Sequence, residues 1–237
     1  MKTFKQYINE NKYDHLSQEE QLKLVQQDGY AIQDIINPSE EVQLAAVQQT
    51  GYAIRYIINP SEEVCLAAVQ KDGYAIQEID NPSEALCLAA VQQAGRAVEY
   101  INNPTLEMCL TAVRQDGYAI EYIKNPTEKV CLAAVKQNGY AIMHIKNPSE
   151  EVQLAGVQQN GYAIRYISNP TLKVQIISYE NYPKIIEKLW FSWNTEFQHW
   201  FVEQNPKNIL KIPRKKLIPE LAQKYKYLLS MGKAGIF

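Results

Sequence analysis

Four cysteines are the residues of this sequence whose type and spacing most directly suggest chemistry. They are Cys65, Cys87, Cys109 and Cys131, each 22 residues after the one before. Equal spacing predicts a row of equivalent positions in successive structural units, on the order of 8–10 Å apart. A disulfide needs Cα atoms within about 7 Å, and a zinc ion needs sulfur atoms about 2.3 Å from it. The spacing therefore predicts free thiols in a half-buried row, with no metal ion.

Catalytic candidates are sparse. The three histidines, His15, His144 and His199, lie in unrelated contexts, and no phosphate-binding loop, dinucleotide fingerprint or metalloprotease motif occurs. Glutamate pairs such as Glu40 and Glu41 look like paired carboxylates, but they fall in the first turn of a predicted helix, where a negative charge stabilises the helix dipole. We therefore expect a protein that is not an enzyme and holds no cofactor.

The cysteine spacing belongs to a repeat that organises most of the chain. Glycines recur every 22 residues from Gly29 to Gly161, and Asn-Pro pairs recur with the same period. Residues 37–58 match residues 59–80 at 16 of 22 positions. An internal repeat of this length is typical of a solenoid. We assign residues 1–14 to an N-terminal cap, 15–176 to seven units plus a partial one, and 177–237 to a C-terminal segment.

Each unit carries start and stop signals for two helices. In one unit, Asn37 is the predicted N-cap, Pro38 suits the first helical position, and Glu40 suits a capping box. Gly51 is predicted to end this helix in the left-handed conformation. Residues 52–58 then form a shorter helix, with Tyr52 and Tyr56 one turn apart, which the next Asn-Pro pair ends.

The positions that are identical in all seven copies predict the core. In the first full unit they are Leu44, Val47, Gly51, Ala53 and Ile57. Units this small cannot bury such a face alone, so neighbours must stack. The predicted fold is all-α: an α-solenoid of 22-residue two-helix repeats, a HEAT-like superhelix, with an aromatic-rich helical C-terminal cap.

The motif LAAVKQNGYAIMHI at residues 132–145 resembles the short helical repeats of the family called domain of unknown function 4116. The resemblance extends over about residues 15–176. It implies a helical repeat fold and no established chemistry. Because the family occurs in bacterial, phage and giant-virus proteins, the resemblance also implies a host-directed inhibitor or adaptor as a special case, placed in the host cytoplasm.

Two columns of side chains could form a binding surface. One is aromatic and consists of Tyr30, Tyr52, Tyr74, Tyr118, Tyr140 and Tyr162, with Arg96 in place of a seventh ring. These rings either pack between neighbouring units or bind a ligand, and Arg96 marks either a drifted unit or a site. The second column varies, and on it we place a candidate recognition surface at Tyr100, Tyr122, His144 and Tyr166, because tyrosine is favoured in recognition surfaces.

The C-terminal segment differs in composition from the repeats. From Gln175 onward it has 10 Lys+Arg and 5 Asp+Glu, whereas residues 1–174 have 14 and 21. Trp190, Trp193 and Trp200 lie on a predicted amphipathic helix, which either caps the last repeat or binds a partner or a second copy of the chain. The candidate basic cluster of this segment is Arg214, Lys215 and Lys216, which raises contact with nucleic acid as an alternative.

These features favour a binding or scaffold protein that engages a protein partner, with homodimerisation through the C-terminal helices as a further expectation. The alternative is a small ligand such as a nucleotide, held by Arg55, Arg96 and Arg165 beside tyrosines. No apolar run of membrane-spanning length occurs, and the first 15 residues are too polar for a signal peptide, so we expect a cytoplasmic protein without membrane contact.

Overall fold

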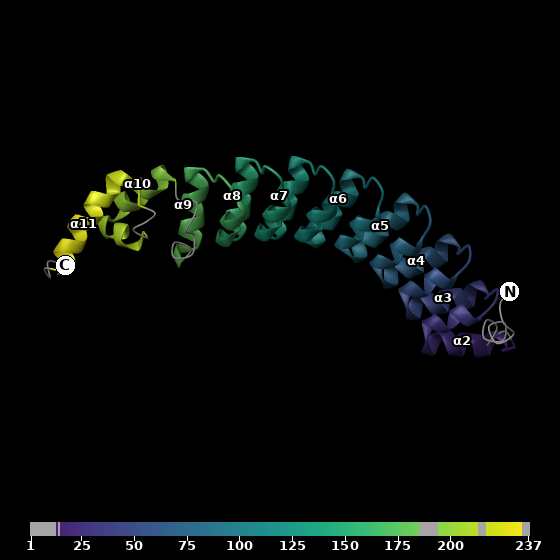
Figure 1. Cartoon of the computed structure of the whole chain (residues 1–237). Helices are drawn as coiled ribbons and strands as arrows, with labels where there is room; N and C mark the ends of the chain where they lie inside the picture. The colour runs from purple at the N-terminus through teal and green to yellow at the C-terminus, as the bar shows by residue number, and fades with distance from the viewer. Residues whose placement is uncertain (1–12, 14, 185–193, 213–216, 234–237) are drawn as a thin grey trace, which may run out of the picture. The chain divides into compact units, whose positions relative to one another are not determined.

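The computed structural model describes residue 13 and residues 15–184, 194–212 and 217–233. Within these ranges the chain is helical and contains no strand. Ten-residue α-helices alternate with six-residue 3₁₀-helices through the repeats, and neighbouring pairs pack in tandem (Figure 1). This arrangement confirms the predicted helical repeat solenoid, with the shorter helix in the tighter 3₁₀ form.

The chain forms two compact units, residues 1–125 and residues 126–237. Unit 1 contains α2 (Gln18–Gln27), η1 (Gly29–Asp34), α3 (Glu40–Gln49), η2 (Gly51–Tyr56), α4 (Glu62–Lys71), η3 (Gly73–Glu78), α5 (Glu84–Gln93), η4 (Gly95–Tyr100), α6 (Leu106–Gln115) and η5 (Gly117–Tyr122). Unit 2 contains α7 (Glu128–Gln137), η6 (Gly139–His144), α8 (Glu150–Gln159), η7 (Gly161–Tyr166), α9 (Leu172–Asn181), α10 (Thr195–Gln204), η9 (Pro206–Lys211) and α11 (Pro219–Lys233). None of the described helices combines the length and apolar character needed to cross a membrane.

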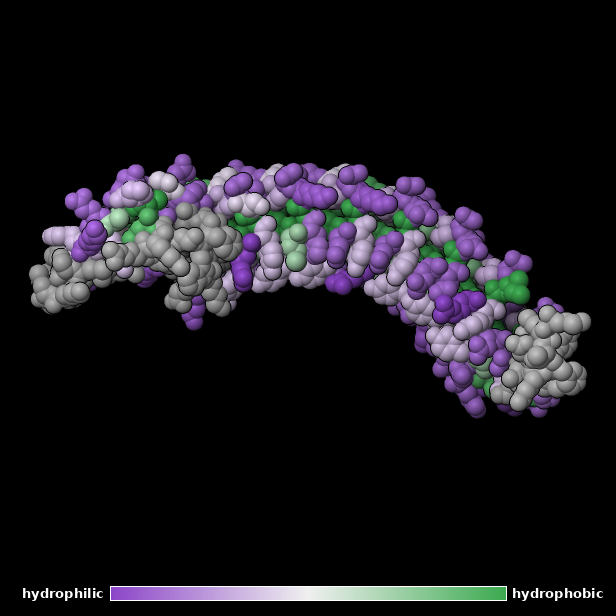
Figure 2. All heavy atoms as spheres, viewed as in Figure 1, coloured by the Kyte–Doolittle hydropathy of each residue, from purple (hydrophilic) through white to green (hydrophobic). Residues whose placement is uncertain are grey.

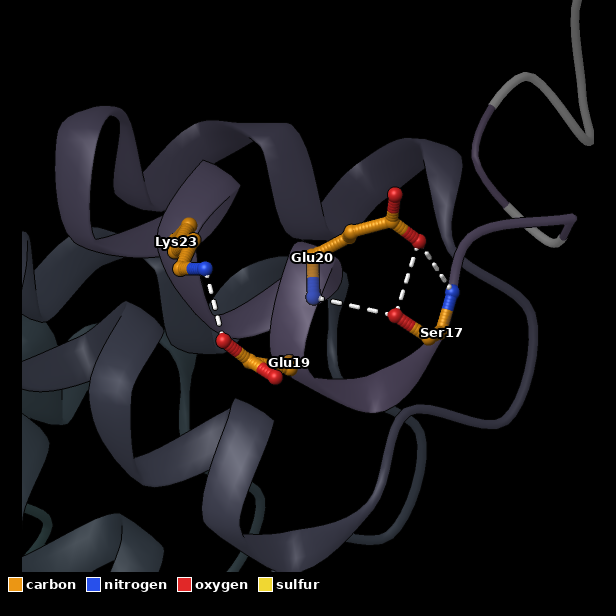
Figure 3. Close-up of polar contacts among 4 residues, drawn as sticks. All are labelled: Ser17, Glu19, Glu20 and Lys23. Atoms are coloured by element: carbon orange, nitrogen blue, oxygen red, sulfur yellow. Dashed lines mark hydrogen bonds and ion pairs between the residues drawn. The ribbon is translucent and has the colours of Figure 1, made fainter.

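The α-helices of the repeats begin later than the sequence patterns predicted. In α3 the N-cap is Ser39, whose hydroxyl accepts a hydrogen bond from the N–H of Val42, so the predictions of Asn37 as N-cap and Glu40 as capping-box residue are wrong. The true capping box is in α2, where Glu20 accepts from the backbone N–H of Ser17 at 2.8 Å (Figure 3). In α3 the third helical residue is Val42, which has no polar group to complete a box.

The asparagine of most Asn-Pro pairs has a different role, because in six of the repeats it adopts the left-handed conformation. Its φ lies between 49° and 55° in these residues: Asn37, Asn59, Asn81, Asn103, Asn125 and Asn147. Asparagine tolerates this region better than most residues with a Cβ atom. From η1 to η6, the left-handed turn that follows the 3₁₀-helix is therefore made by asparagine.

The repeated glycines serve close packing. The prediction that Gly51 ends its helix in the left-handed conformation is wrong, because the C-cap is Thr50 in an extended conformation and Gly51 begins η2. A Cβ atom on Gly51 would lie 2.7 Å from the carbonyl oxygen of Ala68 in the next repeat. The same distance would be 2.6 Å from Gly73 to Ala90. Only glycine lets the 3₁₀-helix approach the neighbouring α-helix so closely.

The core of each repeat consists of small and β-branched side chains. Val47, Ala53 and Ile57 are buried as predicted, and Val42 and Ile54 join them. The leucine column is only partly in the core, which corrects the prediction for Leu44: that residue is half-buried, and Leu66, its equivalent in the next repeat, is 37% exposed. On the face viewed in Figure 2, hydrophobic side chains show between rows of more hydrophilic ones.

The first-turn glutamates connect neighbouring repeats. Glu62 accepts a hydrogen bond from the hydroxyl of Ser83 at 2.8 Å, and Ser83 is the N-cap of the next helix. In unit 2, Glu150 accepts from Thr171 at 2.6 Å in the same way. The first-turn position predicted for these carboxylates is confirmed, and the structure adds this contact between repeats.

The end of the repeat array in unit 2 is covered by α10. Phe197 and Phe201 of α10 are buried, and their rings lie 6.3 Å and 5.1 Å from the ring of Tyr179 in α9. Leu172 and Ile176 of α9 pack against the same cluster. Aromatic side chains of the C-terminal segment thus pack on the last repeat helix, as expected of a solenoid cap.

The close approach at the glycines predicts a contrast between two alanine variants of unit 2. Gly139→Ala places a Cβ atom 2.6 Å from the carbonyl oxygen of Gly156, and we expect a loss of stability of about 2 kcal/mol or more because backbone must move. Gly156→Ala meets only the end of the Ile142 side chain, at 3.3 Å, and other repeats carry alanine there. We expect this control to be neutral, or to gain up to about 1 kcal/mol from helix propensity. Urea unfolding followed by circular dichroism measures both, and equal stabilities would contradict the packing role.

The left-handed asparagines predict a second contrast. Asn81 has a φ of 49°, so Asn81→Ala should cost about 1–2 kcal/mol, because a Cβ atom without a compensating polar group is strained there. Asn81→Gly should stay within about 0.5 kcal/mol of the parent, since glycine enters this region freely. Thermal unfolding of the two variants tests this, and the reverse order of their midpoints would refute it.

Candidate functional site

The 3₁₀-helices present a row of tyrosines that we call the tyrosine ridge, defined as the side chains at their second and sixth positions. In unit 1 the ridge comprises Tyr30, Asp34, Tyr52, Tyr56, Tyr74, Glu78, Arg96, Tyr100, Tyr118 and Tyr122, and in unit 2 it comprises Tyr140, His144, Tyr162 and Tyr166.

Rings of the ridge pair between neighbouring repeats. Tyr30 meets Tyr56 edge to face with centroids 6.1 Å apart, and Tyr74 meets Tyr100 in the same way at 6.3 Å. The expected contact between Tyr52 and Tyr56 within one helix does not fit a 3₁₀-helix, because residues four apart do not share a face when there are three residues per turn. The prediction that rings of the tyrosine column pack between neighbouring units is confirmed for these pairs.

The four residues of the predicted recognition surface all lie on the ridge, two in each unit. In unit 1, Tyr100 is 40% exposed and Tyr122 is half-buried. In unit 2, Tyr166 is 44% exposed, and its ring meets Tyr140 at 5.9 Å, while His144 is half-buried. The structure therefore places each of them at the surface of its own unit, held beside other ridge residues.

Arg96 occupies a defined position on the ridge. Its Nε donates to Oδ2 of Asp116 in the next repeat at 2.6 Å, and its guanidinium lies 5.6 Å from the ring centroid of Tyr118. The hydrogen bond that Arg96 donates to Asp116 raises the pKa of Arg96 above its ordinary value. Sequence reasoning singled out Arg96 but missed Asp116. The signal for it was the variable residue before each repeated glycine, which is Asp, Thr, Ala or Asn.

Arg55 is also paired with a carboxylate. It lies 3.4 Å from Oε1 of Glu78 and 6.0 Å from the ring centroid of Tyr56. A phosphate bound by Arg55 and Arg96 would therefore have to displace Glu78 and Asp116 and bury negative charge beside them. Arg165, the third arginine of the nucleotide hypothesis, is exposed in unit 2.

The cysteine column hydrogen-bonds to the backbone. The four thiols are free and buried, and Cys87 Sγ lies 4.0 Å from the carbonyl oxygen of Pro82. Where the column has glutamine, the side chain donates to the same carbonyl, as Gln43 does to Pro38 at 2.9 Å. The column thus supplies a donor to a carbonyl that precedes the helix. No group of His, Cys, Asp and Glu side chains in the described part of the chain is arranged to hold a metal ion.

Among the predicted C-terminal residues, the structure places Trp200. Its ring lies 6.0 Å from Tyr179 and 5.4 Å from Phe197, within the cluster that covers α9. Trp190, Trp193, Arg214, Lys215 and Lys216 lie outside the described residues.

Charge divides the two units more sharply than the sequence segments suggested. Residues 15–125 contain 16 Asp+Glu and 6 Lys+Arg, a net charge of −10, while residues 126–237 contain 8 and 15, a net charge of +7. On the ridge of unit 1, burial raises the pKa of the Tyr122 hydroxyl, and the neighbouring Glu121 and Glu99 raise it further. The hydroxyl of Tyr122 therefore lies close to negative charge.

The 22-residue period, the helix pair that it encodes and the glycine contact now allow the comparison with known families. Residues 105–150 match the family described as domain of unknown function (DUF4116). The matched part of the chain runs from the N-cap of α6 to the first residue of α8, about two repeats, and confirms over these residues the resemblance drawn from the motif. No curated protein and no solved structure matches the chain. The description of the DUF4116 family names no activity, and the exposed side chains are the remaining evidence on function.

The buried cysteines predict how pH acts on the protein. Burial raises the pKa of the Cys65, Cys87, Cys109 and Cys131 thiols above the value in the unfolded chain. This contribution to stability is complete below the unfolded pKa of about 8.5 and is lost as pH rises toward the folded pKa. We expect the urea midpoint to fall between pH 7.5 and 9.5, and the native thiols to react with a disulfide reagent at least about tenfold more slowly than in the unfolded chain.

The matched control replaces all four cysteines with glutamine, the residue that other repeats carry in this column. Its urea midpoint should fall less over the same pH range. Native thiols that react as fast as unfolded ones would contradict the burial.

Proposed function

We propose that this protein is a binding or scaffold protein without catalytic activity, and that its tyrosine ridge engages a protein partner. The observation that carries the proposal is the set of ring pairs such as Tyr74 and Tyr100, which hold large aromatic side chains rigidly at the surface. Rigid tyrosines offer contact area at a small cost in conformational entropy. Stacked repeats extend such a surface along the molecule.

Variation along the ridge supports the same proposal. The core positions Val47, Ala53 and Ile57 carry the same residue types in every repeat, whereas the sixth position of the 3₁₀-helix is Asp34, Tyr56 or His144 in different repeats. Packing between repeats therefore does not fix the residue at this position, so contact with a partner can determine it. A special case of this proposal is a protein that inhibits a host protein or acts as an adaptor for it.

Two alternatives have less support. A bound nucleotide would need arginines that already pair with carboxylates in unit 1. Nucleic acid would be repelled by residues 15–125 with their net charge of −10, and the basic residues that suggested it belong to unit 2. The C-terminal aromatic cluster contacts α9, which leaves less of it for a second copy of the chain.

A quantitative pulldown from the native host tests the proposal with the full chain. Tyr56→Ala combined with Tyr100→Ala removes two exposed rings of the ridge, and we expect capture of the partner to fall at least about tenfold, as for the loss of aromatic interface residues. The control combines Gln48→Ala and Gln70→Ala, two exposed residues on the α-helices, and should retain the partner.

Circular dichroism before the pulldown checks that both variants fold. A folded ridge variant that captures the same partner at the parental level would overturn the assignment of the ridge. Absence of any specifically captured protein with the parent chain would overturn the proposed function itself.

A further inference from the structure

The ridge of unit 1 differs in charge from the ridge of unit 2, although the two share the same fold. In unit 1 the 3₁₀-helices and their flanking residues carry eight acidic residues, Asp28, Asp34, Asp72, Glu78, Asp80, Glu99, Asp116 and Glu121, against three basic ones, Arg55, Arg96 and Lys124. The equivalent positions of η6 and η7 in unit 2 carry no acidic residue and include Asn138, Met143, His144, Lys146, Asn160 and Arg165. The acidic character is therefore a property of one unit and not of the repeat.

Capping of the 3₁₀-helices does not require an acidic side chain. Asp72 Oδ1 accepts the N–H of Tyr74 at 3.0 Å, and in unit 2 Asn138 Oδ1 accepts the N–H of Tyr140 at the same distance. Ala94 is the N-cap of η4 and makes no side-chain hydrogen bond there. Because a neutral side chain serves the cap equally well, capping does not account for the negative charge of Asp28 and Asp72.

The ridge already holds a guanidinium of its own chain. Arg96 donates a hydrogen bond to the carboxylate of Asp116 and lies over the ring of Tyr118. Arg55 makes the same two kinds of contact, with Glu78 and Tyr56, and both of its distances are longer. A carboxylate beside a tyrosine face is a favourable environment for arginine, which combines an ion pair with a cation–π contact. These two contacts indicate which side chain the surface suits.

We propose that the tyrosine ridge of unit 1 binds an extended protein segment rich in arginine and lysine, an inference that rests on the proposed function and specifies its partner. Equivalent ridge positions lie one repeat apart, on the order of 8–10 Å. An extended chain in the polyproline II conformation has three residues per turn and rises about 3.1 Å per residue, so side chains three residues apart lie on the same side, roughly 9 Å from one another. Basic side chains three residues apart in the partner therefore meet successive repeats of the ridge.

The direct test measures binding of a fluorescein-labelled peptide, (Arg-Ser-Gly)₅, to the full chain by fluorescence anisotropy at about 50 mM salt, where exposed charges are weakly screened. Asp28→Asn, Asp72→Asn and Glu99→Gln together remove three charges that flank the ridge and keep both caps, since asparagine performs the same capping in unit 2. We expect this variant to bind the peptide about tenfold more weakly, as for the loss of several exposed ion pairs.

The matched control removes three acidic charges from the same unit away from the ridge, through Glu63→Gln, Glu84→Gln and Glu107→Gln in the first turns of α4, α5 and α6. It should bind within about twofold of the parent, because its net charge equals that of the ridge variant while the ridge is intact. The peptide (Glu-Ser-Gly)₅ should not bind to any of the three proteins.

Three results would overturn the inference: no binding of the arginine peptide, equal weakening in the two variants, or self-association of the chain at the same salt concentration, which would assign the ridge to a second copy. If the peptide fails to bind while the pulldown still captures a partner through Tyr56 and Tyr100, the basic partner is wrong and the proposed function stands. Selective weakening in the ridge variant alone supports the inference.

Discussion

The stacking of the repeats depends on one close contact, between the glycine that begins a 3₁₀-helix and a carbonyl group of the next α-helix in the same unit. At Gly51 a Cβ atom would approach the oxygen of Ala68 to 2.7 Å, well inside van der Waals distance. Since the same contact recurs along each unit, the 3₁₀-helices lie at a nearly constant spacing. The edge-to-face tyrosine pairs, with centroid distances of 6.1 Å and 6.3 Å in unit 1, follow from that spacing.

Hydrogen bonds at the ends of the helices are satisfied by several interchangeable side chains. Cys87 and Gln43 both lie against a proline carbonyl, and Asp72 and Asn138 both cap a 3₁₀-helix. These positions accept side chains of different charge, and Ala94 caps its 3₁₀-helix without any side-chain hydrogen bond. Charge on these positions can therefore change without loss of the fold.

That freedom connects the scaffold to its proposed role. Core residues such as Val47 and Ala53 recur in every 22-residue repeat. The exposed ridge combines tyrosines with acidic residues in unit 1 and with neutral or basic residues in unit 2. A partner would therefore recognise the charge pattern displayed on a common framework. The DUF4116 match covers about two repeats of this framework, residues 105–150, and assigns no chemistry to the surface.

The sequence by itself determined the 22-residue unit, the two helices in it, the aromatic column and the free cysteines, because these depend on periodicity and local propensity. Only the tertiary structure assigned the roles of the punctuating residues, giving the left-handed turn to Asn37 and the close contact to Gly51. It also moved Leu66 toward solvent and paired Arg96 with Asp116, twenty residues away. Those outcomes depend on contacts between successive repeats. The distances of these contacts are set when the repeats stack and are not encoded within any single repeat.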